Sequence, residues 1–134
     1  MAEVSIIIPT KNRPGLISQA INSVLHQTYK NWELFIVNDS TEKILLNQSD
    51  PRIHLVENQL LPGANGARNT GINLSSGNYI AFLDDDDDWS PRKLESQHQL
   101  IKKNKLDFVM SDYRVNNIID NNTYDISLDK FSID

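Results

Sequence analysis

Short segments that are apolar at nearly every position constrain the fold of this chain most. Residues 4–9 (VSIIIP), 32–37 (WELFIV) and 79–83 (YIAFL) are rich in β-branched and aromatic side chains, and each is too short for a buried helix. Strands that do not alternate apolar with polar side chains are typical of a parallel sheet covered on both faces. We therefore expect three buried strands, with residues 79–83 at the centre of the sheet.

Helical patterns lie between these strands. Apolar side chains recur on one helical face after Pro14, a residue suited to a first helical turn. The predicted helices run from Pro14 to Leu25, over about 67–74, and from Pro91 to about Lys103. Two further strands are expected at 53–57 and 108–111, and loops beyond residue 115.

Strands that alternate with helices predict an α/β domain with a mostly parallel central sheet and helices on both faces. We assign residues 1–115 to this domain and residues 116–134 to a loop-rich tail. No apolar stretch approaches the roughly 20 residues that a membrane-spanning helix needs, and we expect no signal peptide.

The acidic charge of the chain is concentrated in one place. The net charge is −5, and Asp84–Asp88 form a run of five consecutive carboxylates. Without that run, acidic and basic residues balance at 13 each. A surface without basic excess argues against nucleic-acid binding. The absence of cysteine excludes disulfides and thiolate metal sites and fits a reducing compartment.

Polar clusters follow three of the predicted strands, namely Thr10–Arg13, Asn38–Ser40 and Asp84–Asp88. Ligands of open α/β sheets bind beyond the carboxyl ends of the strands, so the clusters are expected to meet at one site. Each cluster also has a structural explanation. The first could cap a helix, the second could form a turn, and the third could be a solvated acidic loop.

The aspartates suit a hard cation because carboxylate oxygens are the ligands that Mg²⁺ and Mn²⁺ prefer. Side chains at i and i+2 of an extended segment point to the same side, so Asp84 and Asp86 can address one ion while Asp85 faces elsewhere. The segment Gly63–Gly71 lacks the dinucleotide-binding glycine pattern. Its small residues would let a helix pack close to the sheet, with Arg68 and Asn69 free to meet a ligand or the aspartates, although Arg68 could also simply neutralise the local acidic charge.

The order of these motifs resembles the family 2 glycosyltransferases of the glycosyltransferase-A fold, a Rossmann-like α/β fold, from about Val4 to Tyr113. The matching segments are VSIIIPT with Asn12-Arg13, AIxSVLxQTY at 20–29, ELxIVxD at 33–39, DPRI at 50–53, Gly63 with ARNxGI at 67–72, and GxYIAFLDDDDxW at 77–89.

The resemblance implies a role for each matching position. Residues implied to line the nucleotide pocket are Pro9, Thr10, Asn12, Arg13, Asp39, Arg68, Asn69 and Asp85. Asp39 would accept a hydrogen bond from the base, usually uracil, and Asp85 would lie near the ribose or sugar. Asp84 and Asp86 would hold Mn²⁺ or Mg²⁺, with Asp86 the direct ligand. Lys11 departs from the family, where an aromatic residue is frequent.

The implied reaction is inverting transfer of a sugar from a nucleoside diphosphate, usually UDP, to the hydroxyl of a saccharide or lipid-linked acceptor in polysaccharide biosynthesis. The catalytic base would lie beyond Asp134, so the chain would be a truncated donor-binding half. The implied location is cytoplasmic, at the inner face of the membrane in the full-length protein.

Two other functions stay open at this point. The chain could be a nucleotide-sugar-binding module without turnover. It could also be a phosphatase of the haloacid-dehalogenase type, although that resemblance requires Thr or Val where Asp88 stands.

Overall fold

The computed structural model describes residues 1–46, 49–117 and 122–126. Its elements are β1 (Val4–Thr10), α1 (Pro14–Leu25), β2 (Trp32–Asn38), β3 (Ile53–Glu57), α2 (Ala64–Leu74), β4 (Tyr79–Phe82), α3 (Lys93–Asn104), β5 (Tyr113–Asn117) and β6 (Asn122–Ile126). The chain divides into two compact units, Met1–Lys93 and Leu94–Asp134.

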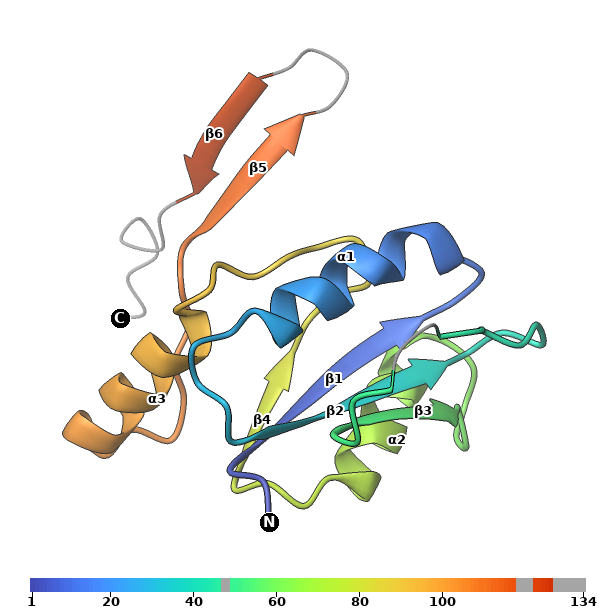
Figure 1. Ribbon diagram of the computed structural model, residues 1–134, viewed down its shortest axis with the longest axis horizontal. Coiled ribbons are helices and arrows are strands. Elements are labelled where there is room, and N and C mark those ends of the chain that lie inside the picture. Colours follow the sequence, from blue (N-terminus) through green and yellow to red (C-terminus); the bar gives the residue numbers. More distant parts are fainter. Residues whose placement is uncertain (47–48, 118–121, 127–134) are drawn as a thin grey trace. The chain divides into compact units, whose positions relative to one another are not determined.

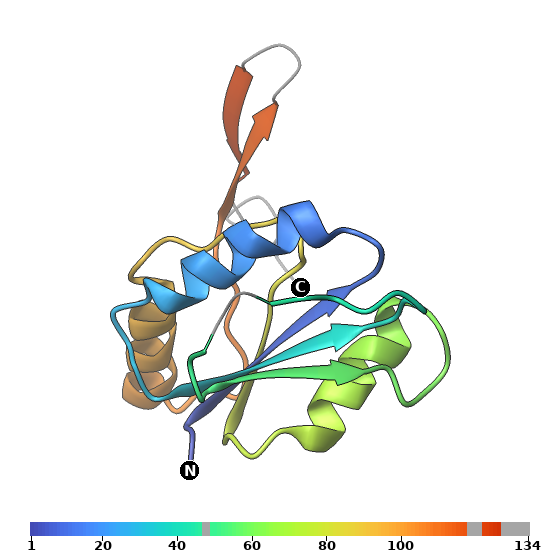
Figure 2. The same ribbon diagram turned by 45° about the vertical axis from the view of Figure 1, so that its right-hand side comes forward.

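The first unit is built on a parallel four-stranded sheet with the order β3-β2-β1-β4 (Figure 1). The chain moves outward from β1 to β3 and then returns to the other side of β1. Because parallel crossovers are right-handed, this reversal places the two connecting helices on opposite faces. Figure 2 shows α1 and α2 on opposite faces of the sheet, so the predicted α/β architecture is confirmed.

The core of this unit lies around β1 and β2. All seven residues of β1 are buried, as are six of the seven in β2, which matches the expectation for continuously apolar strands. From α1, the side chains of Ile17, Ala20 and Val24 are also buried. Each fully buried aliphatic side chain contributes about 1.5–3 kcal/mol, so this central pair of strands holds the rest of the unit in place.

Strand β4 differs from the expectation. It pairs only with β1 among the described residues, so it forms an edge of the sheet rather than its centre. Ile80 and Phe82 are 37% and 47% exposed, whereas Leu83 is buried. The prediction of a central, fully buried strand is therefore wrong for the described part of the chain, because an apolar run does not specify its position in the sheet.

Helix α2 begins at Ala64, earlier than the predicted start at 67. Gly63 takes a φ of 110°, a conformation that favours glycine, and its carbonyl accepts the first helical hydrogen bond, from Ala67 N. Further along, a Cβ on Gly71 would lie 2.6 Å from Ile7 Cγ2, so the small residue lets α2 pack closely on β1.

The second unit contains α3 and an antiparallel hairpin of β5 and β6. The strand predicted at 108–111 is not formed, and the predicted loops beyond 115 include part of the hairpin. A strand needs a neighbour, and 113–117 pairs with 122–126. Residues 118–121 and 127–134 of the predicted tail lie outside the described residues, and the boundary at 115 stays a prediction. No described helix is long and apolar enough to span a bilayer.

Candidate nucleotide-binding site

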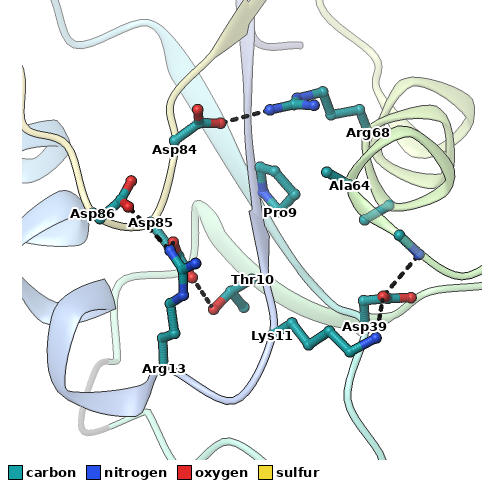
Figure 3. A pocket seen from close by; sticks show the side chains of 12 residues that line it. Pro9, Thr10, Lys11, Arg13, Asp39, Ala64, Arg68, Asp84, Asp85 and Asp86 are labelled. Carbon is teal, nitrogen blue, oxygen red and sulfur yellow. Dashed lines mark hydrogen bonds and ion pairs between the residues drawn. The ribbon is translucent and has the colours of Figure 1, made fainter.

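A pocket of about 450 Å³ opens in the first unit, where β1, β2 and β4 end and α2 begins (Figure 3). The volume falls within the range that small-molecule ligands occupy. The sheet order reverses between β1 and β4, which is where α/β sheets bind their ligands. The pocket is lined by Pro9, Thr10, Lys11, Arg13, Asp39, Gly63, Ala64, Ala67, Arg68, Asp84, Asp85 and Asp86.

One end of the pocket is formed around Asp39, which follows β2. Its side chain is only 7% exposed. Oδ1 accepts a hydrogen bond from Asn58 Nδ2 at 2.6 Å, and Oδ2 accepts from Gly63 N at 2.8 Å and from Lys11 Nζ at 3.2 Å. The Asn58 and Gly63 hydrogen bonds and the Lys11 ammonium hold the pKa of Asp39 below its usual value. Asp39 is therefore an ionised hydrogen-bond acceptor with a fixed orientation.

The loop between β3 and α2 fixes Asn58. Asn58 Oδ1 accepts hydrogen bonds from Thr70 Oγ1 at 2.8 Å and Leu60 N at 3.1 Å, and its Nδ2 also donates to Leu61 O at 3.0 Å. Thr70 is buried on α2. This network connects the loop, the helix and the Asp39 carboxylate, so the position of Asp39 depends on residues well outside the pocket wall.

The other end of the pocket contains the aspartates that follow β4. Asp85 is buried and accepts hydrogen bonds from Thr10 Oγ1 at 2.7 Å and Arg13 Nη1 at 3.2 Å. Arg13 Nη1 also lies 3.0 Å from Asp86 Oδ2. On the opposite side, Arg68 Nη2 lies 2.7 Å from Asp84 Oδ1 (Figure 3). Two guanidinium groups from different elements therefore offset part of the acidic charge.

Repulsion within the aspartate run remains. Partial desolvation of the Asp87 carboxyl, together with the charges of Asp86, Asp84 and Asp88, raises its pKa. Just after the run, Gln27 Nε2 donates a hydrogen bond to Ser90 O at 2.7 Å, which connects this segment to the residues that follow α1. A segment that concentrates negative charge favours the binding of a positively charged partner.

The carboxylates of Asp84 and Asp86 are chemically suited to bind a divalent cation. The side chains of Asp84 and Asp86 are each 51% exposed, and each uses only one carboxylate oxygen with a protein partner in the described chain. The described residues contain no group of three or more acidic or histidine side chains gathered as a metal site. A cation here would need oxygens from a bound ligand to complete its shell, as is usual for Mg²⁺ with phosphates.

Most of the predicted site residues line this pocket, and two do not. Asn12, at a φ of 54°, accepts a hydrogen bond from Ser40 Oγ and connects the loops after β1 and β2. Asn69 is exposed on α2 and does not line the pocket. Their nucleotide-binding roles stay predictions.

Sequence reasoning missed Lys11 and Asn58 as site residues. Asn58 directly follows β3, and its main-chain N–H bonds Asn38 O at 2.8 Å. The same argument that identified Asp39, a polar residue after a parallel strand, would have identified Asn58. Lys11 belonged to the predicted polar cluster Thr10–Arg13 and was noted as a departure from the family, but it was given no role of its own, because its contact with Asp39 is between residues 28 positions apart.

Comparison with known proteins identifies the family. A family model for glycosyl transferase family 2 matches residues 5–131. The chain belongs to this family. Its fold is the glycosyltransferase-A fold, as the resemblance implied, and the family match favours the glycosyltransferase hypothesis over the phosphatase.

Named relatives of this family 2 domain include two bacterial proteins. The chain is 46% identical over 124 residues to the UDP-Glc:alpha-D-GlcNAc-diphosphoundecaprenol beta-1,3-glucosyltransferase WfgD of Escherichia coli. This match covers 90% of the chain and 48% of the relative. The chain is 37% identical to the putative teichuronic acid biosynthesis glycosyltransferase TuaG of Bacillus subtilis, over 82% of this chain and 46% of the relative. The chain thus spans about half the length of these relatives.

Solved structures with the same fold include TarS of S. aureus in complex with UDP. That structure, of TarS 1-349, matches with a TM-score of 0.64 and 25% identity, over 77% of this chain and 32% of the TarS 1-349 chain. The mannosyltransferase PcManGT from Pyrobaculum calidifontis, in complex with GDP-Man and Mn²⁺, matches with a TM-score of 0.56 and 22% identity, over 70% of this chain and 30% of that one. The second likeness concerns the fold alone.

Proposed function

We propose that this family 2 domain binds a nucleoside diphosphate sugar, with UDP as the nucleotide, and that the whole protein transfers the sugar to an acceptor hydroxyl with inversion. The observation that carries the proposal is a single pocket with two different ends. One end presents the ionised acceptor Asp39, and the other presents aspartates and arginines.

The two ends suit the two halves of the donor. A base with an N–H group finds an acceptor in Asp39, which is held ready by Asn58 and Gly63. The diphosphate belongs at the other end, where Arg13 and Arg68 supply guanidinium groups that match phosphate geometry. The likeness to TarS, a structure with UDP, supports a uridine nucleotide.

Mn²⁺ or Mg²⁺ would be held by Asp84 and Asp86 at the diphosphate end. When bound, such an ion supplies electrostatic stabilisation of the negative charge that develops on the leaving diphosphate. The residues of this chain position the reacting sugar: Thr10 and Arg13 orient Asp85, which then faces the ribose or sugar. The base that takes the proton from the acceptor hydroxyl is proposed to lie beyond Asp134.

The acceptor is proposed to be a saccharide or a lipid-linked saccharide. The name of WfgD specifies a diphosphoundecaprenol-linked acceptor for that relative. A lipid-linked acceptor would bring the whole protein to the inner face of the membrane, in keeping with a role in polysaccharide biosynthesis. Transfer assays on the full-length protein, compared with this domain, separate a donor-binding half from a module that never transfers sugar.

Titration calorimetry of UDP with and without Mn²⁺ tests the donor site. We expect UDP to bind at least tenfold more tightly with Mn²⁺, and Asp86→Asn to remove that gain, because a neutral amide is a poor ligand for a hard cation. Asp88→Asn is the matched control, because Asp88 belongs to the same acidic run but does not line the pocket. Equal UDP affinity with and without the ion, or equal effects of the two variants, would reject the metal assignment.

A further inference from the structure

We propose that Lys11 is a specificity-determining residue, whose ammonium donates a hydrogen bond to a carbonyl oxygen of the nucleobase while Asp39 accepts from the neighbouring ring N–H. The pair would select bases with an N–H beside a C=O, as in uracil and guanine. This inference rests on the proposed function and deepens it, because it names the feature of the nucleotide that the pocket recognises.

The first support is the number of acceptor positions left on Asp39. A carboxylate has about four lone-pair positions. Oδ2 accepts from Gly63 N and Lys11 Nζ, and Oδ1 accepts from Asn58 Nδ2. One position on Oδ1 therefore remains for a ligand. A carboxylate that is held ionised can only accept, so the group that meets it must be a donor.

The second support is the number of donors left on Lys11. An ammonium has three N–H groups, and Lys11 uses one of them on Asp39 at 3.2 Å. The structure gives Lys11 no other side-chain partner in the described chain, and its side chain is 57% exposed at the pocket wall. Its remaining N–H groups are therefore available to an acceptor on a ligand that lies against Asp39.

The third support is the spacing of the two groups. Their contact places a donor and an acceptor side by side, in the arrangement that complements an N–H next to a carbonyl (Figure 3). Uracil and guanine present that pair at the middle of their pairing edge, whereas the corresponding ring nitrogen of cytosine or adenine is an acceptor. Cytosine would have to shift by one ring position to use both groups. Anchoring of the diphosphate by Arg13 and Arg68 at the other end of the pocket opposes that shift.

A general electrostatic role for Lys11 predicts a different result. A cation at the pocket wall attracts every nucleoside diphosphate equally, because the attraction acts on the phosphates. Direct contact with the base changes the affinity of UDP more than that of CDP. The ratio of the two affinities therefore isolates base recognition from the attraction of charge.

The experiment measures UDP and CDP affinities in the presence of Mn²⁺ for the wild-type domain and three variants. In Lys11→Met we expect UDP affinity to fall about tenfold, the lower end of what a hydrogen bond to a charged group contributes, and CDP affinity to fall clearly less. Lys11→Arg keeps a charged donor and should retain most of the preference for UDP. Lys43→Met is the control, because Lys43 is an exposed lysine that does not line the pocket.

Thermal unfolding of each variant establishes that the domain is folded before its ratio is compared. An equal fall of UDP and CDP affinity in Lys11→Met overturns the inference and leaves the donor site intact. Absence of UDP binding to the wild-type domain overturns the proposed function and the inference together.

Discussion

Replacement of Gly66 by alanine is expected to destabilise the domain and to disturb the end of the pocket around Asp39. A Cβ at this position would lie 1.7 Å from the carbonyl oxygen of Leu61 and 2.8 Å from its carbonyl carbon. Favourable contacts of carbon atoms begin near 3.5 Å, so the loop backbone must move by more than about 1 Å. Leu61 O also accepts a hydrogen bond from Asn58, which in turn holds Asp39.

The size of the effect follows from two opposing contributions. Alanine is about 1 kcal/mol more favourable than glycine inside a helix. Forcing extra atoms into a packed site costs about 1–3 kcal/mol and occasionally more, and a backbone atom cannot rotate away as a side chain can. Because the clash is with backbone, we take the upper end of that cost, about 3 kcal/mol, so Gly66→Ala should lower the free energy of unfolding by a net of about 2 kcal/mol. It should also lower UDP affinity about tenfold, because Asn58 and Asp39 are displaced.

Two other helical glycines provide controls for the same substitution. A Cβ on Gly15 meets no atom within 4 Å, so Gly15→Ala should stabilise by about 0.5–1 kcal/mol. The three atoms nearest to a Cβ on Gly71 are all side-chain atoms of Ile7, the closest at 2.6 Å, so Gly71→Ala should give an intermediate result. Denaturant unfolding and UDP calorimetry measure the series. If Gly66→Ala proved as stable as Gly15→Ala, the close packing of the loop on α2 would be refuted.

Two more predictions concern charged pairs. Arg68→Gln should raise the affinity for Mn²⁺ alone about fivefold, because it removes the cation that competes for Asp84, and should lower UDP affinity, both measured by calorimetry. The Arg52 guanidinium lowers the pKa of Asp50 from 3.8 to about 2. The pair therefore stabilises the fold above about pH 4 and loses this contribution as the pH falls toward 2, so a stability profile against pH should be flatter in this range for Asp50→Asn. A parallel profile for the wild type and the variant would contradict this assignment.

The sequence alone predicted the central strands of the fold and most of the residues that line the pocket. Continuous apolar runs predicted β1 and β2, because a strand with apolar side chains on both of its faces must be covered on both faces. Polar residues after strands predicted that Thr10, Asp39 and Asp85 would gather, because the carboxyl ends of parallel strands lie at one edge of a sheet. These signals are local, and a single chain displays them directly.

Only the tertiary structure decided which groups meet inside the pocket and where each strand stands. Asp85 accepts a hydrogen bond from Thr10, which lies 75 residues away in the sequence. Asp39 accepts hydrogen bonds from Lys11 and Asn58, which lie 28 and 19 residues away in the sequence. The edge position of β4 and the pairing of 113–117 instead of 108–111 likewise depend on which neighbours are available. Periodicity and composition describe the surroundings that a side chain requires, whereas the partner that supplies them is selected by packing between distant segments.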